Sequence, residues 1–504
     1  MSALDLVSVR PAAVPPAASL KPTPTIAVNS QPAPERTPGL QRNRYALPVL
    51  LLVTLLTLIA FDRPLVRGDG LAYLIWIDTL VLDGDVNFNN QHDRFREINT
   101  YQIAWNDTTQ RWVNIFPFGV AFVQAPFYVV GHVLAQADIG NANPDYFRAM
   151  QGVTLPYSLL LMIGANVMAL ATVALSWGVG RRFCDDVTAA LVVYALLIGT
   201  PLLYYSSVSP VNSHNPGAFG IAGLAYLFVR TLPSSQDTAE NERPKSPLFW
   251  LLLGLFAALS ILSRWQLALV VVPLWTALTG AALRGEVHWR GLLLATITAG
   301  VALLPLPLIW NTLFGSPFLV PFDAVSDQAF IRDHNNSVDV LRVLVVHSPL
   351  VLLSFAGVIA LITQQRGRLG LLLAAIIGLQ LFINGAALDW DAGDSYGMRR
   401  MSEIYAIYVL LGCAAVGAFA AWGRERRWRW LLPIMRGLLT AAVAYSLVYL
   451  MAHLVFTWTN TQGVFSAAPG TMIAHWLRHP YRWQVAWEVY RAHVGPLAWA
   501  MPGP

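Results

Sequence analysis

Apolar runs long enough to cross a lipid bilayer recur along most of this chain. A membrane-spanning helix needs about 20 mostly apolar residues, and a soluble domain carries about 25% charged residues. Here 56% of the 504 residues are hydrophobic and only 12% are charged, so the length reflects many spans rather than several soluble domains. The sequence predicts an all-α polytopic membrane protein with about eleven transmembrane helices. The predicted spans are 45–61, 153–178, 187–205, 215–231, 248–263, 266–283, 291–310, 343–363, 369–388, 402–422 and 430–456.

Basic residues gather in alternate loops between these runs. Short loops rich in Arg and Lys stay in the cytoplasm, so the clusters orient the bundle and place the N-terminus inside. The net charge of +5 is therefore an orientation signal rather than evidence for nucleic-acid binding. The clusters are Arg42 and Arg44; Arg181 and Arg182; Arg230, Arg243 and Lys245; Arg284 and Arg290; Arg366 and Arg368; and Arg424, Arg426, Arg427 and Arg429.

Three regions follow from this pattern. Residues 1–41 are rich in Pro, Ala, Ser and Thr without an apolar core, which predicts a disordered cytoplasmic tail. Residues 42–456 form the transmembrane domain, and 457–504 form an external C-terminal segment. Cys184 and Cys413 are expected to be free thiols, since two cysteines make no disulfide framework.

The first external loop, residues 62–152, is the largest. Within it, apolar residues recur at helical spacing from Leu71 to Val81, with Asp78 and Thr79 between them, which predicts a helix lying on the membrane surface. The apolar segment 115–136 is broken by Pro and Gly. We expect it to lie on the surface or to re-enter rather than to span.

Asp69 is the candidate catalytic residue. It stands between Gly68 and Gly70 just after the first span, and glycines permit a sharp turn and close approach of a ligand. A carboxylate here suits a general base or a metal ligand. The alternative is an ordinary turn that caps a helix.

Further acidic residues follow in the same loop. Asp83 and Asp85, with three asparagines after them, offer hard oxygen ligands but no calcium-loop spacing. Such strings more often make turns. No metal site is predicted, although a divalent metal stays possible.

Two clusters supply candidate substrate-binding residues from distant loops. His214 lies at the start of the fourth span. Arg264 and Trp265 form the very short link between two apolar runs. An arginine at membrane depth marks a functional site by default. The planar guanidinium suits a lipid phosphate, and the indole suits a sugar or the membrane interface.

The second cluster is Asp389 to Arg400, which holds the candidates Asp394, Tyr396, Arg399 and Arg400. The positive-inside rule disfavours adjacent arginines on the external side, which indicates an anionic partner such as a polyprenyl phosphate. The alternative is mutual pairing of Asp and Arg, with Glu403 as a further partner.

With these residues in hand, the chain resembles the C-type glycosyltransferases (GT-C superfamily), and among them bacterial relatives of protein O-mannosyltransferases and lipid A aminoarabinose transferases. The resemblance covers roughly residues 45 to 420. It implies an acidic residue in the first external loop, which Asp69 matches, and a polyprenyl-phosphate sugar donor. Many members have two near-adjacent acids there, whereas Asp69 stands alone. The stretches that carry it are GDGLAYLIWIDTLVLDGDVNFNN, FPFGVAFVQAPFYVVGHVL, GTPLLYYSSVSPVNSH, LSRWQLAL and SYGMRR.

The expected activity is inverting transfer of a hexose or pentose from a polyprenyl-phosphate donor to an acceptor hydroxyl on a lipid, glycan or protein. The resemblance implies the external face of a bacterial cytoplasmic membrane and no cofactor. Asp69 would be the base, the arginines would hold the phosphate, and Trp265 and Tyr396 would shape the sugar pocket. The alternatives are a lipid-linked-sugar flippase and a polysaccharide polymerase or ligase that uses a diphosphate-linked donor.

Overall fold

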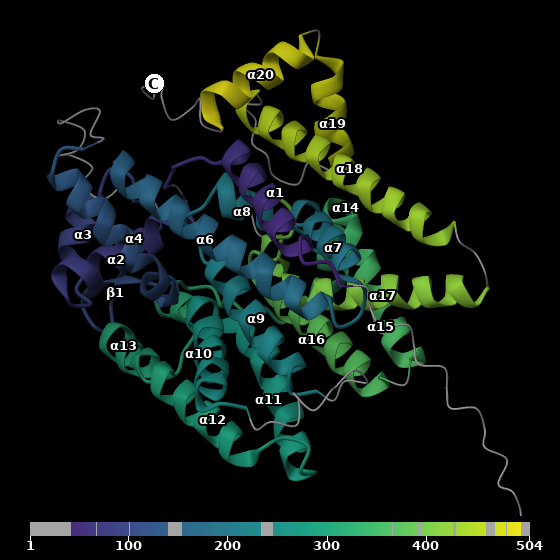
Figure 1. Ribbon diagram of the computed structural model, residues 1–504. Coiled ribbons are helices and arrows are strands. Elements are labelled where there is room, and N and C mark those ends of the chain that lie inside the picture. Colours follow the sequence, from purple (N-terminus) through teal and green to yellow (C-terminus); the bar gives the residue numbers. More distant parts are fainter. Residues whose placement is uncertain are drawn as a thin grey trace, which may run out of the picture. The chain divides into compact units, whose positions relative to one another are not determined.

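The computed structural model describes most of the chain and places it in one helical assembly (Figure 1). The predicted tail, residues 1–41, lies outside the described residues, as does part of the C-terminal segment. The described ranges are 42–66, 68–99, 101–139, 154–232, 245–364, 366–391, 395–426, 430–459, 469–479 and 481–494.

The first part of the described chain holds short helices and one hairpin. Its strands, β1 and β2, pair antiparallel with Ile103 opposite Asn114. The elements are α1 (Ala46–Phe61), α2 (Asp69–Asp78), a π-helical turn (Thr79–Asp83), α3 (Asn89–Arg94), β1 (Ile103–Asn106), β2 (Arg111–Asn114), α4 (Gly119–Gln136), α6 (Leu155–Gly180), α7 (Asp186–Gly199), α8 (Leu202–Ser207) and α9 (His214–Val229).

The remaining helices complete the bundle and continue into the C-terminal segment. They are α10 (Pro247–Ser263), α11 (Ala268–Leu283), α12 (Trp289–Leu303), α13 (Pro305–Phe314), α14 (Ser337–His347), α15 (Leu352–Thr363), α16 (Gly367–Ala386), α17 (Tyr405–Glu425), α18 (Leu431–Thr459), α19 (Pro469–Arg478) and α20 (Arg482–His493), with short 3-10 turns at Trp265–Leu267, Pro321–Ala324, Pro349–Val351 and Arg399–Met401.

The chain is a multi-pass membrane protein, but the predicted count of eleven spans is not confirmed. Within the described ranges, seven helices are long and apolar enough to cross a bilayer, or eight if α14 and α15, bent by 108°, form one broken span. The apolar helices α1, α7 and α10 are shorter, at 16, 14 and 17 residues. The run predicted at 187–205 is divided because Thr200 and Pro201 end α7 before α8 begins. The long apolar helices are Gly119–Gln136, Leu155–Gly180, Trp265–Leu283, Trp289–Phe314, Gly367–Ala386, Tyr405–Glu425 and Pro433–Thr457.

The segment predicted to be broken by proline and glycine forms the continuous helix α4. Pro126 lies inside it, and Gly131 packs against the backbone of Pro156 at the start of α6. The helix passes the length and composition test for a span. The expectation that it lies on the surface or re-enters stays a prediction.

The helix predicted to lie on the membrane surface is enclosed by protein, and its position relative to the membrane stays a prediction. It forms at α2, but Gly70 to Asp78 are all buried. Asp78 accepts a 2.6 Å hydrogen bond from the Tyr128 hydroxyl and pairs with Arg94, so its polar side chain faces protein partners rather than water. The apolar spacing from Leu71 to Val81 does not reveal these partners, because they are distant in sequence. They fix the C-terminal end of the helix that begins with Asp69.

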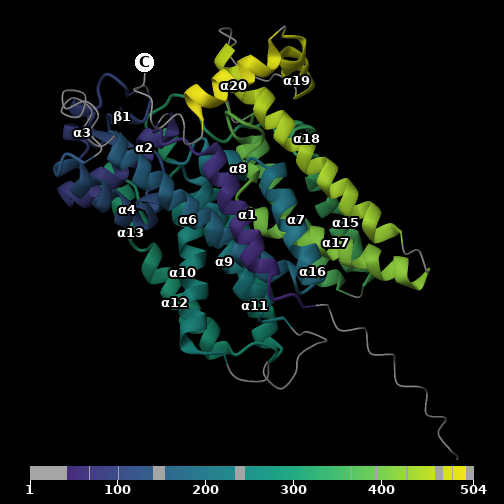
Figure 2. The same ribbon diagram turned by 45° about the horizontal axis from the view of Figure 1, so that its top comes forward.

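Two apolar cores organise the molecule. The larger core joins the long helices, and a second core joins α2, α4 and the hairpin to the end of α13. Figure 2 shows α2, α3, β1 and α4 gathered beside α6, with α13 nearby. Val211 and Leu262 belong to the second core, and they lie next to His214 and Arg264 in the chain. The first-loop region and the segments that carry the predicted site therefore pack as one unit.

Two cysteines and Asp62 are buried among the helices. Cys184 and Cys413 are free thiols, as expected, and both are buried. Asp62 is also buried and accepts a 2.6 Å hydrogen bond from Asn166, so it joins α1 to α6.

Gly119 provides a test of this packing. A Cβ there would lie 2.4 Å from the backbone carbon of Leu262, two residues before Arg264. Gly119→Ala should therefore force the end of α10 away and destabilise the fold by about 1–3 kcal/mol, the usual range for overpacking. Thermal melting in detergent would show a lower transition temperature. Gly300→Ala in α12 is the control, because a Cβ there meets nothing within 4 Å. Equal melting of both variants would contradict the contact.

Candidate active site

Asp69 is the first residue of α2, and both neighbouring glycines are needed there. Gly68 has φ +55°, which favours glycine. A Cβ on Gly70 would lie 2.6 Å from the carbonyl oxygen of Val211. The backbone thus turns sharply and approaches the loop before α9, as the flanking glycines predict.

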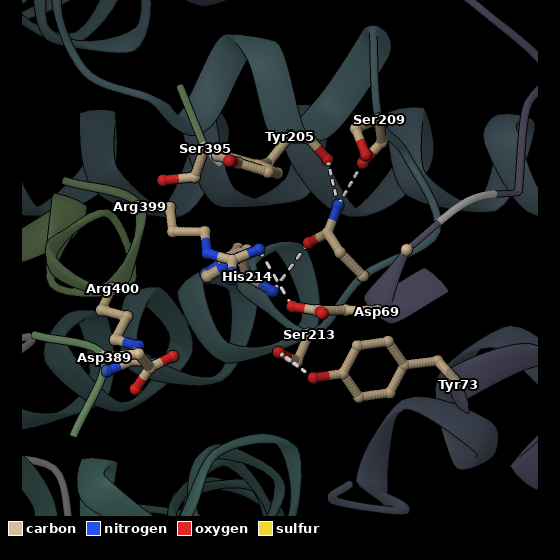
Figure 3. A network of polar contacts seen from close by, with 12 residues as sticks. Asp69, Tyr73, Tyr205, Ser209, Ser213, His214, Asp389, Ser395, Arg399 and Arg400 are labelled. Carbon is tan, nitrogen blue, oxygen red and sulfur yellow. Dashed lines mark hydrogen bonds and ion pairs between the residues drawn. The ribbon is translucent and has the colours of Figure 1, made fainter. Parts of the chain in front are cut away.

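The carboxylate of Asp69 contacts other segments rather than capping its own helix. Oδ1 accepts a 2.8 Å hydrogen bond from the hydroxyl of Tyr101, and Oδ2 lies 2.9 Å from Nη1 of Arg399. Figure 3 shows the Arg399 side chain directed toward Asp69. These contacts are compatible with Asp69 as a general base. They do not match a carboxylate that caps its own helix.

Electrostatics keep Asp69 ionised. Burial alone would raise the pKa of Asp69, but attraction to Arg399 and the hydrogen bond from Tyr101 outweigh burial and hold that pKa below its usual range. The same pair raises the pKa of Arg399 against the effect of burial. Each charge therefore stabilises the other at neutral pH.

The adjacent arginines in the 3-10 turn before α17 have different partners. Arg399 contacts Asp69, while Arg400 pairs with Asp389. Figure 3 shows them entering from one segment, with Arg400 turned toward Asp389. The predicted mutual pairing of Asp and Arg within this cluster is thus observed for Arg400 and Asp389. Arg399 instead contacts a carboxylate 330 positions away in the chain.

A buried network holds the other predicted residues. Oε1 of Glu403 lies 2.7 Å from Nδ1 of His214 and 3.0 Å from Nε of Arg264. Nη1 of Arg264 donates a 3.0 Å hydrogen bond to Ser213, whose oxygen also accepts from Tyr73. Burial raises the pKa of Glu403 to about 7, with Arg264 opposing that shift. The network fixes Arg264 beside α2 and α9.

These groups surround a cavity of about 710 Å³. Its size lies within the usual range of small-molecule sites. Carboxylate, guanidinium and aromatic side chains all contribute to the wall. The polar and aromatic lining includes Asp69, Tyr73, Tyr101, Phe116, Tyr204, Tyr205, Ser209, Asn212, His214, Arg264, Trp265, Gln266, Phe322, Phe330, Asp389, Ser395, Arg399, Arg400, His453 and Thr457.

Six of the eight predicted site residues line this cavity, and Tyr396 does not. Tyr396 is buried in a stack between Tyr204 and Tyr449, with ring centroids 4.8 and 5.1 Å away. Its backbone N–H donates a 3.1 Å hydrogen bond to the hydroxyl of Tyr205, which does line the cavity. Tyr396 thus supports a wall residue. Asp394 lies outside the described residues. The predicted residues on the wall are Asp69, His214, Arg264, Trp265, Arg399 and Arg400.

The second acidic group of the first loop makes turns. Asp85 accepts a 2.9 Å hydrogen bond from the backbone of Asn87, and Asp83 accepts one of 2.9 Å from Asn90. Among the residues that the structure describes, no group of three or more His, Cys, Asp or Glu side chains is placed to hold a metal ion.

Sequence reasoning missed Tyr101 and gave Glu403 only a minor role. Tyr101 precedes β1 without any motif around it, and only the hairpin brings it to Asp69. Glu403 carried one signal, an acid at the edge of an apolar run, but its partners Arg264 and His214 lie more than 130 positions away.

Comparisons with known proteins give two kinds of result. No protein-family model matches the chain, and no curated protein matches it. Solved structures do match. The archaeal oligosaccharyltransferase AglB from Archaeoglobus fulgidus, in complex with an inhibitory peptide and a dolichol-phosphate, has a TM-score of 0.49 and 11% identity, covering 91% of this chain and 60% of its own. ArnT from Cupriavidus metallidurans, bound to undecaprenyl phosphate, has a TM-score of 0.46 and 11% identity, covering 89% of this chain and 76% of its own.

Both are C-type glycosyltransferases. That is the superfamily which the sequence resembles. The chain spans about 60% of the length of AglB. Because the TM-scores lie below 0.5 and the identities near one in nine, these likenesses by themselves assign no substrate and no reaction to the chain.

The ion pair at Asp69 predicts a pH-dependent stability. A carboxylate whose folded-state pKa is depressed stabilises the fold above its unfolded pKa, about 3.9, and that contribution is lost as pH falls through the folded value. Asp69→Asn should therefore melt below the wild type at pH 7, and the gap should close as the pH falls below about 4.

Scanning fluorimetry of the detergent-solubilised protein measures this gap. Asp107→Asn, in an exposed turn of the same loop, is the matched control and should show no comparable loss at pH 7. A gap for Asp69→Asn that is constant over the whole pH range would contradict the ion pair.

Proposed function

We propose that the chain is a membrane glycosyltransferase that moves one sugar from a polyprenyl-phosphate donor to an acceptor hydroxyl. One observation carries the proposal: an ionised carboxylate lies beside guanidinium groups on the wall of a cavity large enough for a sugar phosphate. The resemblance of the sequence to C-type glycosyltransferases supports the same reaction. A carboxylate suits the removal of a proton, and guanidinium groups suit a phosphate.

The transfer needs a base and a stabilised leaving group. Asp69 takes the proton of the acceptor hydroxyl as its oxygen bonds to the anomeric carbon. The bond from that carbon to the phosphate oxygen breaks on the opposite side, and its electrons stay on the phosphate. Because the acceptor oxygen attacks the face opposite the leaving phosphate, the anomeric configuration is inverted. Arg264, Arg399 and Arg400 stabilise the charge that grows on the phosphate.

The pairing of Asp69 with Arg399 gives the donor a role in preparing the base. An ion-paired carboxylate with a depressed pKa is a weak base. A donor phosphate beside Arg399 competes with Asp69 for the guanidinium, because phosphate, like carboxylate, accepts charge-assisted hydrogen bonds from arginine. As Arg399 turns toward the phosphate, Asp69 loses a stabilising charge and becomes more basic next to the acceptor. Donor binding then precedes catalysis.

The other wall residues suit a sugar and its surroundings. Trp265 offers an apolar face for a sugar ring, and His214, held by Glu403, contacts a hydroxyl or the phosphate. Tyr396 acts through the wall residue Tyr205 rather than by contact. Asp394 stays a proposed substrate contact.

The cavity is proposed to lie on the external face of the membrane. Arg182, Arg230 and Arg284 follow the ends of α6, α9 and α11, whereas the cavity lies where α9 begins and α10 ends. Cytoplasmic retention of the basic loops then puts the N-terminus inside and the cavity on the opposite face of a bacterial cytoplasmic membrane. Lipid-linked donors are suited to that face, where nucleotide sugars are not normally present.

Asp69→Asn should abolish most of the transfer while the protein stays folded. Loss of a general base typically costs about 10²–10⁴-fold in rate. The assay incubates purified protein in lipid with radiolabelled polyprenyl-phosphate sugars and identifies the labelled product. Asp107→Asn is the control and should retain wild-type activity. Undiminished transfer by Asp69→Asn would remove Asp69 from catalysis, and lipid movement across vesicles without a change of mass would favour a flippase.

Tyr101→Phe should move the acidic limb of the activity profile to higher pH. The hydrogen bond from Tyr101 lowers the pKa of Asp69, so its removal raises that pKa, and a higher pH is needed to ionise the base. The pH dependence of kcat/KM for the wild type and the variant measures this shift. Superimposable profiles would show that Tyr101 does not influence the catalytic carboxylate.

A further inference from the structure

A second cavity, of about 1290 Å³, lies at the other end of the bundle. It opens between the last residues of α9 and α11 and the first residues of α16. Helix α9 begins at His214 in the candidate active site and ends at Val229 beside this cavity. A 16-residue helix is roughly 24 Å long, so the two cavities are separate.

Arginines surround this second cavity. One of them, Arg284, already pairs with Glu286, since Nε and Nη2 of Arg284 donate hydrogen bonds of 2.7 and 2.9 Å to that carboxylate. The described lining therefore has more positive than negative charge. The positive end of the α16 dipole adds to it, because the first turn of that helix lies in the wall. The lining arginines are Arg182, Arg284, Arg366 and Arg368.

The wall between these charges is apolar. Val272 on α11 and Leu371 on α16 are 58% and 63% exposed. Both helices are among those long and apolar enough to cross a bilayer, so side chains exposed on them face acyl chains. A site with guanidinium groups at the helix ends and exposed aliphatic side chains along the helices matches an anionic head joined to a hydrocarbon tail.

We infer that this cavity binds an anionic phospholipid. Its phosphate contacts Arg366 and Arg368, and an acyl chain lies along α11 and α16. A free phosphate ion would leave the aliphatic wall uncovered, and a zwitterionic lipid brings a cation that the arginines repel. The occupant is distinct from the sugar donor, whose phosphate belongs to the other end of α9.

The bound lipid would hold together helices whose far ends shape the active site. Helix α9 carries His214, and Gln380 on α16 donates a 3.0 Å hydrogen bond to the backbone oxygen of Gln266, next to Trp265. The lipid is therefore expected to raise the thermal stability of the whole helix bundle rather than to take part in the reaction.

Native mass spectrometry of the full chain tests the inference. The probes are phosphatidylglycerol and phosphatidylcholine with identical acyl chains. The wild type should retain phosphatidylglycerol preferentially, and its melting temperature should rise with that lipid. The double variant Arg366→Glu, Arg368→Glu should lose about tenfold or more of this retention, since each basic residue near anionic lipid contributes to binding. If charge reversal prevents folding, the milder double variant Arg366→Gln, Arg368→Gln is used in its place.

Arg290→Glu is the matched control. Arg290 lies at the same end of the bundle, on exposed α12, and is not part of the described lining. This variant should bind phosphatidylglycerol as the wild type does. Equal retention by the double variant, equal retention of phosphatidylcholine, or an equal rise in melting temperature with inorganic phosphate alone would overturn the inference.

Discussion

The ion pair between Asp69 and Arg399 is the interaction on which this account of the protein depends. It joins the start of α2 to the segment before α17, and it places opposite charges on one cavity wall. Burial makes each charge costly unless the other is present. The pair therefore explains how the fold accommodates a carboxylate just after the first apolar helix and an arginine just before α17. It also sets the order of events proposed for catalysis, because a phosphate must replace Asp69 at Arg399.

A second buried network keeps the rest of the cavity in shape. The Glu403 carboxylate contacts both His214 and Arg264. Arg264 also donates a hydrogen bond to Ser213, in the loop that packs against Gly70. Besides the pair of Arg400 with Asp389, the carboxylates and guanidiniums of the site thus form two arrangements. One is accessible and suited to exchange partners with substrate. The other is almost fully buried, which suits it to hold Arg264 in a fixed orientation.

The sequence predicted the features that depend on local pattern. Apolar runs showed an all-α membrane protein, and charges at their ends pointed to the residues that now line the cavity. The number of spans could not be predicted from composition. Composition does not show that α7 ends before Thr200 and Pro201, or that the chain bends sharply between α14 and α15. The burial of α2 was also missed, since Asp78 finds Tyr128 and Arg94 only in the folded chain. Tyr101 had no signal in the sequence, and Tyr396 was placed in the pocket when it stacks behind it.

The most direct measurement is a double-mutant cycle on Asp69 and Arg399. Melting temperatures are taken at pH 7 for Asp69→Asn, for Arg399→Gln and for the double variant. Residues in direct contact give coupled effects, whereas distant residues give additive ones. If the two charges stabilise each other, each single variant melts well below the wild type and the double variant loses little more than either one. Losses that simply add would show that the carboxylate and the guanidinium do not meet, and the reaction centre described here would not exist.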